Sequence, residues 1–386
     1  MINYHSKILL LSIITLFISA CHGFFEKDNT PEPTPLTKIT PEIKPVRIWV
    51  TKAGTGIGSD YLKMGISANH LAIFIASSNG VVTSIDKKSG LQNWQINTGL
   101  PITTSPGMGD GLMVLGSRRG DVLTLQQNTG KLVWKTTIAS QPFAKPAIKN
   151  GKIIIKTIDG MIRALSCKDG HEIWLFQQIE PNLILHSASN PLIEDQDIII
   201  GFSNGNLVKL NLNDGQLIWT QAMAIPQGAF AIQRMIDIDA DPILFEQHLY
   251  AATYQGKINA INWSNGKIRW SHDISSYTGM IADNNTVYIT DANSHIWAFD
   301  TNSGLVNWRQ DKLRARVLTS PAIQGNYVAV GDAQGYLHWL NKQDGHIVAR
   351  DYLGAMYATP LVQNGVLYAL THNGYLAAYT LSSSSR

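Results

Sequence analysis

The sequence is poor in cysteine and in charge. It contains two cysteines, Cys21 and Cys167, while charged residues make up 15% of the chain and leave a formal net charge of +3. The lysines and arginines are scattered, and Arg118 and Arg119 form the only adjacent pair of arginines. Proteins that hold a nucleic-acid backbone carry a basic patch, so we expect no nucleic-acid partner.

The one long apolar run lies near the N-terminus. Lys7 precedes the stretch 8–18, which is too short to cross a bilayer as a helix and is typical of a signal peptide. The run ends in Ile-Ser-Ala-Cys21, which resembles the lipobox of bacterial lipoproteins, where the cysteine is acylated and becomes the new N-terminus. The alternative is an ordinary signal peptide followed by a chance cysteine. We favour the lipoprotein, with residues 1–20 as its signal peptide and Cys21 as the lipid attachment site.

Lipidation of Cys21 has two consequences. Its sulfur is consumed by the lipid, so Cys167 has no partner for a disulfide within the chain. His22 follows the cysteine, and the absence of aspartate at this position in such lipoproteins implies sorting to the outer membrane.

Residues 21–45 lack apolar periodicity and are rich in proline. The prolines of this stretch are Pro31, Pro33, Pro35, Pro41 and Pro45. Such a composition favours an extended chain. We therefore predict a lipidated, proline-rich tether over 21–45 and a folded domain over 46–386.

One sequence pattern recurs at intervals of about forty residues through the folded part. Each copy has an apolar strand, a hairpin ending in glycine, a second apolar strand, a turn with glycine, and a strand carrying tryptophan. The tryptophans of the six clearest copies are Trp94, Trp134, Trp174, Trp219, Trp270 and Trp308. A seventh copy has Ala349 at this position. Because tryptophan recurs once per copy, we expect it to pack between neighbouring units rather than to perform chemistry.

The eighth copy ends after its strand 375–380 and lacks the tryptophan strand. That strand is found at the other end, where Val-Arg-Ile-Trp49-Val precedes the first complete copy. An N-terminal strand that completes the last unit closes a ring and removes its exposed sheet edges. The pattern therefore predicts an all-β, eight-bladed β-propeller.

The chain carries few signs of catalysis or metal binding. Gly201-Phe-Ser203-Asn-Gly205 matches the nucleophile elbow of hydrolases, but other copies of the same hairpin replace the serine by alanine or arginine. The eleven histidines show no metal-ligand spacing. We expect no enzyme activity, no cofactor and no metal site.

Two connections between repeats are longer than the others. The hairpin glycines are 40 residues apart from Gly80 to Gly120 and again to Gly160, but 45 apart to Gly205 and 51 apart to Gly256. Insertions gathered on one side of a repeat protein commonly mark its binding face. The first insertion contains Leu183, Leu185 and His186, and the second contains Arg234, Asp237 and Asp239. The two aspartates could form an acid/base pair or be simply solvated, but we favour a role at an interface.

The Gly-x-x-x-Trp ending resembles the repeat of quinoprotein propellers. Enzymes of that group that bind pyrroloquinoline quinone also have adjacent cysteines and calcium-binding acids near the axis, and this chain has no adjacent cysteines. The lipobox, tether, eight repeats and length together resemble the BamB family, propeller lipoproteins of the outer-membrane β-barrel assembly (BAM) complex. Stretches 56–61, 318–321 and 330–341 are also similar to that family.

This resemblance implies a scaffold function and a partner. The partner would be a POTRA domain of BamA, the barrel-inserting subunit, with unfolded outer-membrane proteins as possible clients. The family's contact positions fall on Leu183, Leu185 and the aspartates, while His186 stands where the family has arginine. The resemblance also implies a lipid-anchored protein on the periplasmic face of the outer membrane. A quinone-dependent dehydrogenase and a propeller that binds sugar or peptidoglycan are the competing hypotheses.

Overall fold

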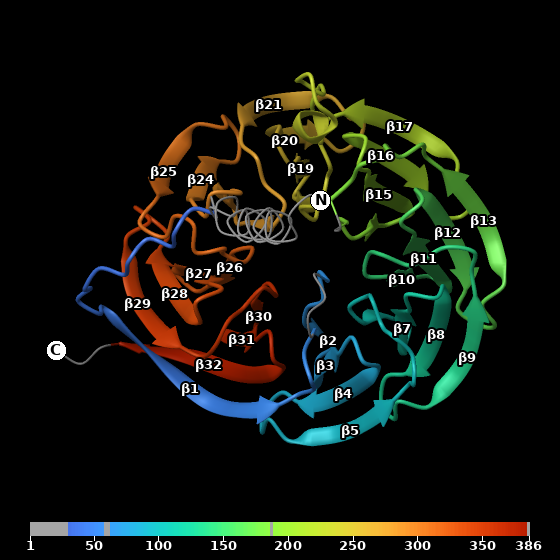
Figure 1. Ribbon diagram of the computed structural model, residues 1–386, viewed down its shortest axis with the longest axis horizontal. Helices are drawn as coiled ribbons and strands as arrows, with labels where there is room; N and C mark the ends of the chain where they lie inside the picture. The colour runs from blue at the N-terminus through green and yellow to red at the C-terminus, as the bar shows by residue number, and fades with distance from the viewer. Residues whose placement is uncertain (1–29, 58–61, 186–187, 384–386) are drawn as a thin grey trace, which may run out of the picture. The chain divides into compact units, whose positions relative to one another are not determined.

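The computed structural model describes residues 30–57, 62–185 and 188–383. Residues 34–386 form one compact unit. Its strands make eight antiparallel four-stranded sheets arranged as blades around a central axis (Figure 1). The predicted eight-bladed β-propeller is therefore confirmed.

Each blade runs from an inner strand near the axis to an outer strand at the rim. Blades 1 to 4 are β2 (Ser67–Ala68), β3 (Ala72–Ala76), β4 (Val81–Asp86) and β5 (Gln92–Asn97); β6 (Gly107–Gly109), β7 (Leu112–Gly116), β8 (Asp121–Gln126) and β9 (Leu132–Thr137); β10 (Ala147–Lys149), β11 (Lys152–Lys156), β12 (Met161–Ser166) and β13 (Glu172–Gln177); β14 (Leu192–Glu194), β15 (Asp197–Gly201), β16 (Asn206–Asn211) and β17 (Leu217–Ala222).

Blades 5 to 8 follow the same order, and the last takes its outer strand from the start of the folded chain. They are β18 (Ile243–Phe245), β19 (His248–Ala252), β20 (Lys257–Asn262) and β21 (Ile268–Asp273); β22 (Gly279–Ala282), β23 (Thr286–Thr290), β24 (Ile296–Asp300) and β25 (Val306–Gln310); β26 (Ala322–Gln324), β27 (Tyr327–Gly331), β28 (Tyr336–Asn341) and β29 (Ile347–Tyr352); β30 (Leu361–Gln363), β31 (Val366–Leu370), β32 (Tyr375–Ser383) and β1 (Ile43–Lys52).

The N-terminal strand β1 closes the ring as predicted. It pairs antiparallel with β32 from Ile43 opposite Ser383 to Lys52 opposite Tyr375, with a bulge between Arg47 and Trp49. The strand thus begins at Ile43, three residues before the start of the predicted domain. Figure 1 shows β1 and β32, from opposite ends of the folded chain, side by side in this blade.

In seven of the eight blades, all but blade 7, the repeated tryptophan joins the blade to the next. Trp49 donates its indole N–H to the carbonyl of Lys87 at 3.1 Å, and Trp94 donates to the carbonyl of Gln127 at 3.0 Å. The ring lies on a turn glycine of the next blade, so a methyl group added at Gly90 would come within 2.6 Å of the Trp49 ring. That glycine also has φ near +73°, a conformation open to glycine at little cost. The expectation of a wedge between blades is confirmed.

The second half of the predicted tether lies on the propeller. The Thr34 N–H donates to the carbonyl of Arg314 at 3.0 Å, and the Arg316 guanidinium donates to the Thr34 carbonyl at 3.1 Å. Leu36 and Ile39 then pack against the apolar cluster between blades 6 and 7. The stretch 21–45 is therefore not free along its whole length, because the composition that suggested a tether does not reveal a docking site far away in sequence.

Candidate functional site

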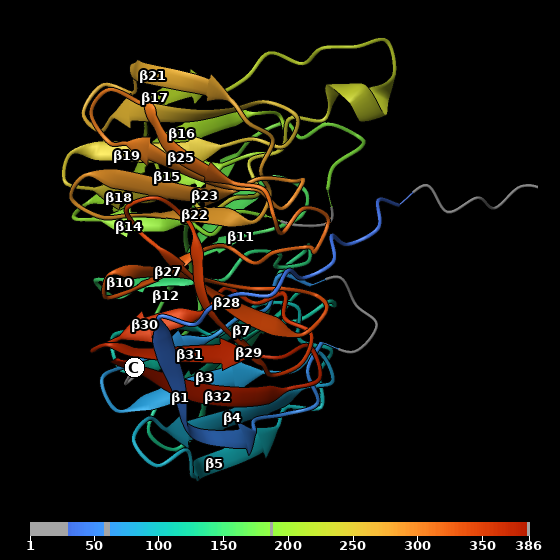
Figure 2. The same cartoon turned by 90° about the vertical axis from the view of Figure 1, so that its left-hand side faces the viewer.

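Two connections rise from one face of the ring, between blades 3 and 4 and between blades 4 and 5. The second carries the short 3-10 helix η1 (Ala231–Arg234), and Figure 2 shows it projecting beyond the blades. These two connections are the insertions that the sequence analysis identified. The connections belong to adjacent blades, so one partner can contact both.

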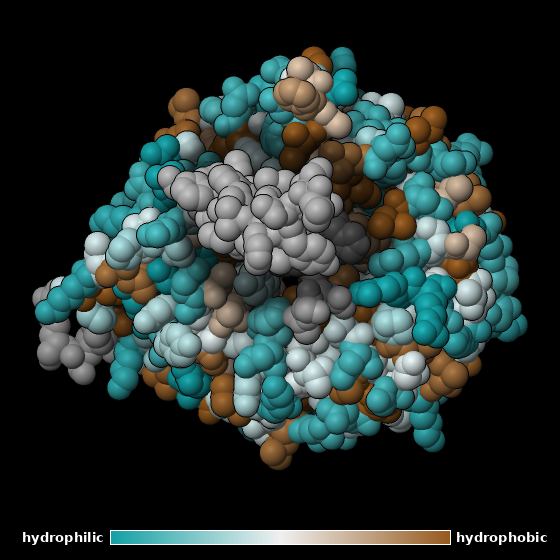
Figure 3. Space-filling model, viewed as in Figure 1, coloured by the Kyte–Doolittle hydropathy of each residue, from teal (hydrophilic) through white to brown (hydrophobic). Residues whose placement is uncertain are grey.

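The connections expose several large apolar side chains. Leu183 is 44% exposed, and Ile179, Ile225, Phe230 and Ile232 are exposed to a greater extent. Figure 3, which looks onto this face, shows apolar residues over the β17–β18 connection. Of these residues the sequence analysis named only Leu183. The other four could have been found in the sequence as apolar residues within the segments that do not follow the repeat.

Leu185 and Arg234 occupy different environments. Leu185 is partly buried, while Arg234 lies in η1 and is exposed. No ion pair joins Arg234 to Asp237 or Asp239 among the residues that the structure describes. His186 lies outside the described residues.

Asp237 and Asp239 are buried, against the expectation that they face a partner. Their exposed fractions are 0% and 1%, and the segment around them is buried on all sides. Asp237 instead accepts a hydrogen bond at 2.9 Å from the backbone N–H of Leu185, so it joins the second connection to the first. Asp237 is therefore placed to hold the loop that carries Leu183 and Leu185. Sequence spacing could not reveal this, because it does not show how an irregular segment folds back.

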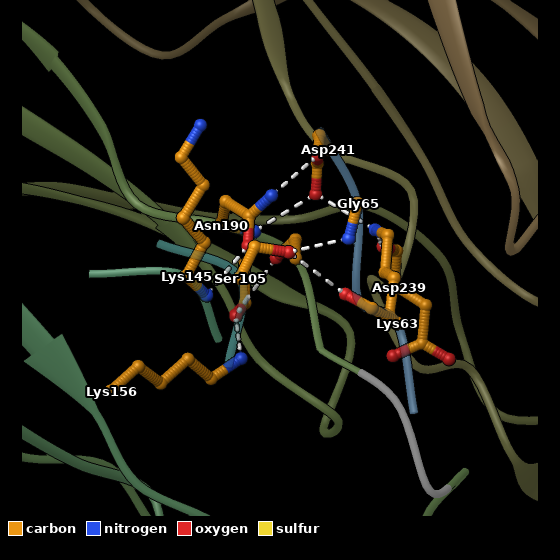
Figure 4. A network of polar contacts seen from close by, with 10 residues as sticks. Lys63, Gly65, Ser105, Lys145, Lys156, Asn190, Asp239 and Asp241 are labelled. Atoms are coloured by element: carbon orange, nitrogen blue, oxygen red, sulfur yellow. Dashed lines mark hydrogen bonds and ion pairs between the residues drawn. The ribbon is translucent and has the colours of Figure 1, made fainter. Parts of the chain in front are cut away.

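Asp239 belongs to a buried group of charges near the axis (Figure 4). Its backbone carbonyl accepts a hydrogen bond at 2.5 Å from the ammonium of Lys63, while one of its carboxylate oxygens is buried without a hydrogen-bond partner among the described residues. The buried ammonium of Lys156 donates at 2.5 Å to the carbonyl of Gly201 nearby. Burial, reinforced by the charge of Asp237, raises the pKa of Asp239 to about 7.

Asp239→Asn should stabilise the protein at neutral pH. The unfolded carboxyl ionises near pH 4, whereas the folded one retains its proton up to about pH 7. The folded state thus binds more protons between these values, and its stability falls as pH rises through that window. The amide keeps the shape of the side chain and removes this charge. Urea unfolding of both proteins at pH 5 and pH 8 should show a smaller loss in the variant, and equal losses would contradict the assignment.

The described part of the chain contains no candidate metal site and no candidate membrane-spanning helix. Within residues 30–57, 62–185 and 188–383, no group of three or more His, Cys, Asp or Glu side chains is placed to hold a metal ion. Over the same residues, no helix has the length and apolar character needed to span a membrane. Cys21 lies outside the described residues.

Known proteins resemble both the sequence and the fold. A family profile described as "Outer membrane protein assembly factor BamB" matches residues 78–310. The protein of that name from Legionella pneumophila (strain Paris) is 36% identical over 358 residues, which cover 92% of this chain and 93% of that protein. The chain belongs to the BamB family. Another member, from Yersinia pestis, is 30% identical over 388 residues, which cover 97% of this chain and 99% of that protein.

Solved structures separate the family from the wider fold. The crystal structure of BamB from Moraxella catarrhalis matches with a TM-score of 0.80 and 27% identity, over 87% of this chain and 100% of that one. A quinohemoprotein alcohol dehydrogenase from Pseudomonas putida matches with a TM-score of 0.72 but only 12% identity, over 89% of this chain and 77% of that one. The dehydrogenase thus shares the fold alone. The predicted resemblance to the BamB family is confirmed.

Proposed function

We propose that the chain is a non-catalytic scaffold lipoprotein of the outer-membrane β-barrel assembly machinery. It is held by its lipid at the periplasmic face of the outer membrane, where it aids the folding and insertion of outer-membrane proteins. Relatives that cover nearly the whole chain are named outer membrane protein assembly factors, which supports this function. Through its partner the chain joins the rest of the assembly complex.

The partner surface consists of the two connections that flank blade 4. Leu183 offers an exposed apolar side chain, and the Asp237 carboxylate accepts the hydrogen bond that fixes the neighbouring Leu185 backbone. A preorganised apolar side chain loses little entropy on binding, which favours its use as an anchor. We assign this surface to a POTRA domain of BamA. We include Leu185, His186 and Arg234 in this surface because they belong to the two connections in the sequence. We propose that Asp237 supports the surface through its hydrogen bond to the Leu185 backbone, while Asp239 lies in the same buried segment.

The main support for this partner surface is that the two connections flanking blade 4 protrude from the ring and expose apolar side chains. Co-purification tests it: the tagged, full-length protein, extracted from membranes in mild detergent, should bring the barrel-inserting subunit with it. Recovery of the tagged protein without that subunit, under conditions that keep the rest of the assembly complex together, would overturn the proposal.

Cys21→Ser should release the protein from the membrane without unfolding it. The lipid is the membrane attachment in this proposal, and in the sequence residue 21 precedes β1, the first blade strand, which begins at Ile43. Fractionation should place the variant in the soluble periplasmic fraction of cells that lack the partner, with an unchanged Tm. A variant that still sediments with outer membranes in those cells would contradict the attachment site.

A further inference from the structure

The residue two positions before the first strand of a blade lies at the centre of the ring. In six blades this residue precedes a proline: Ser105, Lys145, Asn190, Asp241, Ser320 and Thr359. All six line one cavity of about 540 Å³. The repeat therefore places one side chain per blade around this cavity, and their identities set its chemistry.

The acidic member of this set is already neutralised. Asp241 accepts a hydrogen bond at 2.8 Å from the Lys63 ammonium, and it accepts two more from Asn190, at 2.9 Å from the backbone N–H and at 2.7 Å from the side-chain amide. Both carboxylate oxygens are thus occupied by protein donors. Asp241 has little capacity left to balance a second cation.

Lys145 is the basic member of the set, and its ammonium is unpaired. Figure 4 shows its side chain directed away from Asn190 and Asp241, and no hydrogen bond or ion pair reaches its ammonium among the described residues. Lys145 also lines a second cavity of about 370 Å³, so it stands where the two cavities meet. Burial lowers the pKa of Lys145, with a partial opposing effect from Asp241. An anion beside this ammonium would offset its lost hydration.

A second polar group on the larger cavity also lacks a partner. His372 lines the cavity, its Nδ1 atom is buried without a hydrogen bond among the described residues, and its ring stacks edge-on against Tyr357 at 5.3 Å. Buried polar atoms are normally hydrogen-bonded, so this unsatisfied atom is an exception, and it belongs to a residue that lines the cavity.

The rest of the wall is largely apolar or aromatic. Leu62, Met64, Tyr277, Leu318 and Tyr357 contribute to it. A volume of several hundred Å³, apolar walls and a few polar groups are the usual properties of a small-molecule site.

We propose that the central cavity binds an organic acid with an aromatic or aliphatic body, whose carboxylate pairs with the ammonium of Lys145. The body of the ligand packs against the apolar wall. Two sources share this chemistry, a free carboxylic acid and the C-terminus of a peptide that ends in an apolar residue. The site lies at the axis and is independent of the partner surface on the two connections.

Calorimetry with defined probes tests this site in the mature full-length protein in lipid nanodiscs, with empty nanodiscs as the blank. 3-Phenylpropionate should bind, and its uncharged amide should bind at least tenfold more weakly, because a charge-assisted hydrogen bond is lost. Lys145→Met should weaken binding of the acid at least tenfold, while Lys88→Met, at an exposed lysine on a blade turn, should leave it unchanged. Lys145→Arg keeps the charge and should retain most of the affinity.

A second set of titrations, with a peptide as the ligand, distinguishes the two sources of the carboxylate. Tighter binding of Ala-Ala-Phe with a free carboxylate, lost on amidation of its C-terminus, would support the site and identify a peptide terminus. Binding of phenylpropionate alone would support the site and identify a small acid. Equal binding of acid and amide to the unaltered protein, or no binding of any acid at millimolar concentration, would overturn the proposal without affecting the scaffold function. The acid and amide comparison needs no variant, so misfolding of Lys145→Met cannot obscure it.

Discussion

Deletion of residues 43–52 should unfold the whole propeller and not only its eighth blade. This segment is β1, which pairs along its length with β32 and brings Trp49 against blade 1. Its loss leaves β32 with an unpaired edge and removes the contact that joins the last blade to the first. In the closed ring each blade is held by two neighbours. Opening the ring at this point therefore exposes the faces of two blades at once.

Thermal unfolding followed by circular dichroism measures this effect. A milder variant, Trp49→Ala, should lower the free energy of unfolding by about 3 kcal/mol, the lower end of the range for buried tryptophans, because Trp49 is only partly buried. Val50→Ala is the matched control, since it lies on the same strand with its side chain 47% exposed, and it should change little. An unchanged Tm after deletion of β1 would mean that closure does not stabilise the ring.

Leu183→Ala combined with Leu185→Ala should weaken capture of the barrel-inserting subunit by more than tenfold. An apolar anchor at an interface centre contributes about 2 kcal/mol or more, and each 1.4 kcal/mol corresponds to a factor of ten. Both residues lie in an inserted connection outside the blade sheets, so the ring should remain folded. Pulldown of the subunit at graded concentrations, together with the Tm of the variant, measures both properties.

Leu305→Ala provides the control for a general loss of exposed apolar surface. Leu305 is 69% exposed but belongs to blade 6, away from the two connections, so its truncation should leave capture unchanged. A double variant at 183 and 185 that melts normally and captures the subunit at full strength would place the interface elsewhere on the ring.

The repeating part of the fold could be predicted from the sequence because each blade repeats the same local chemistry. A glycine with positive φ and a tryptophan that packs on it recur at fixed spacing, so the blade count followed. Closure of the ring could also be predicted, because the strand with Trp49 precedes the first repeat and the eighth repeat lacks its own tryptophan strand.

The non-repeating part could not be predicted, because its contacts join distant segments. Asp237 is buried by the Leu185 backbone, 52 residues away, and Thr34 is held by Arg314 and Arg316 at the far end of the chain. The sequence shows only that Lys145 precedes Pro146. Only the structure shows that it faces a cavity and that Asp241 is already paired with Lys63.

Photo-crosslinking in intact cells tests the partner surface most directly. A photoreactive amino acid in place of Leu183 or Phe230 should crosslink to the barrel-inserting subunit, because both side chains are exposed on the two connections. The same amino acid in place of Leu305 should give no such product. Crosslinks from position 305 with none from 183 or 230 would contradict a scaffold that binds through the connections flanking blade 4.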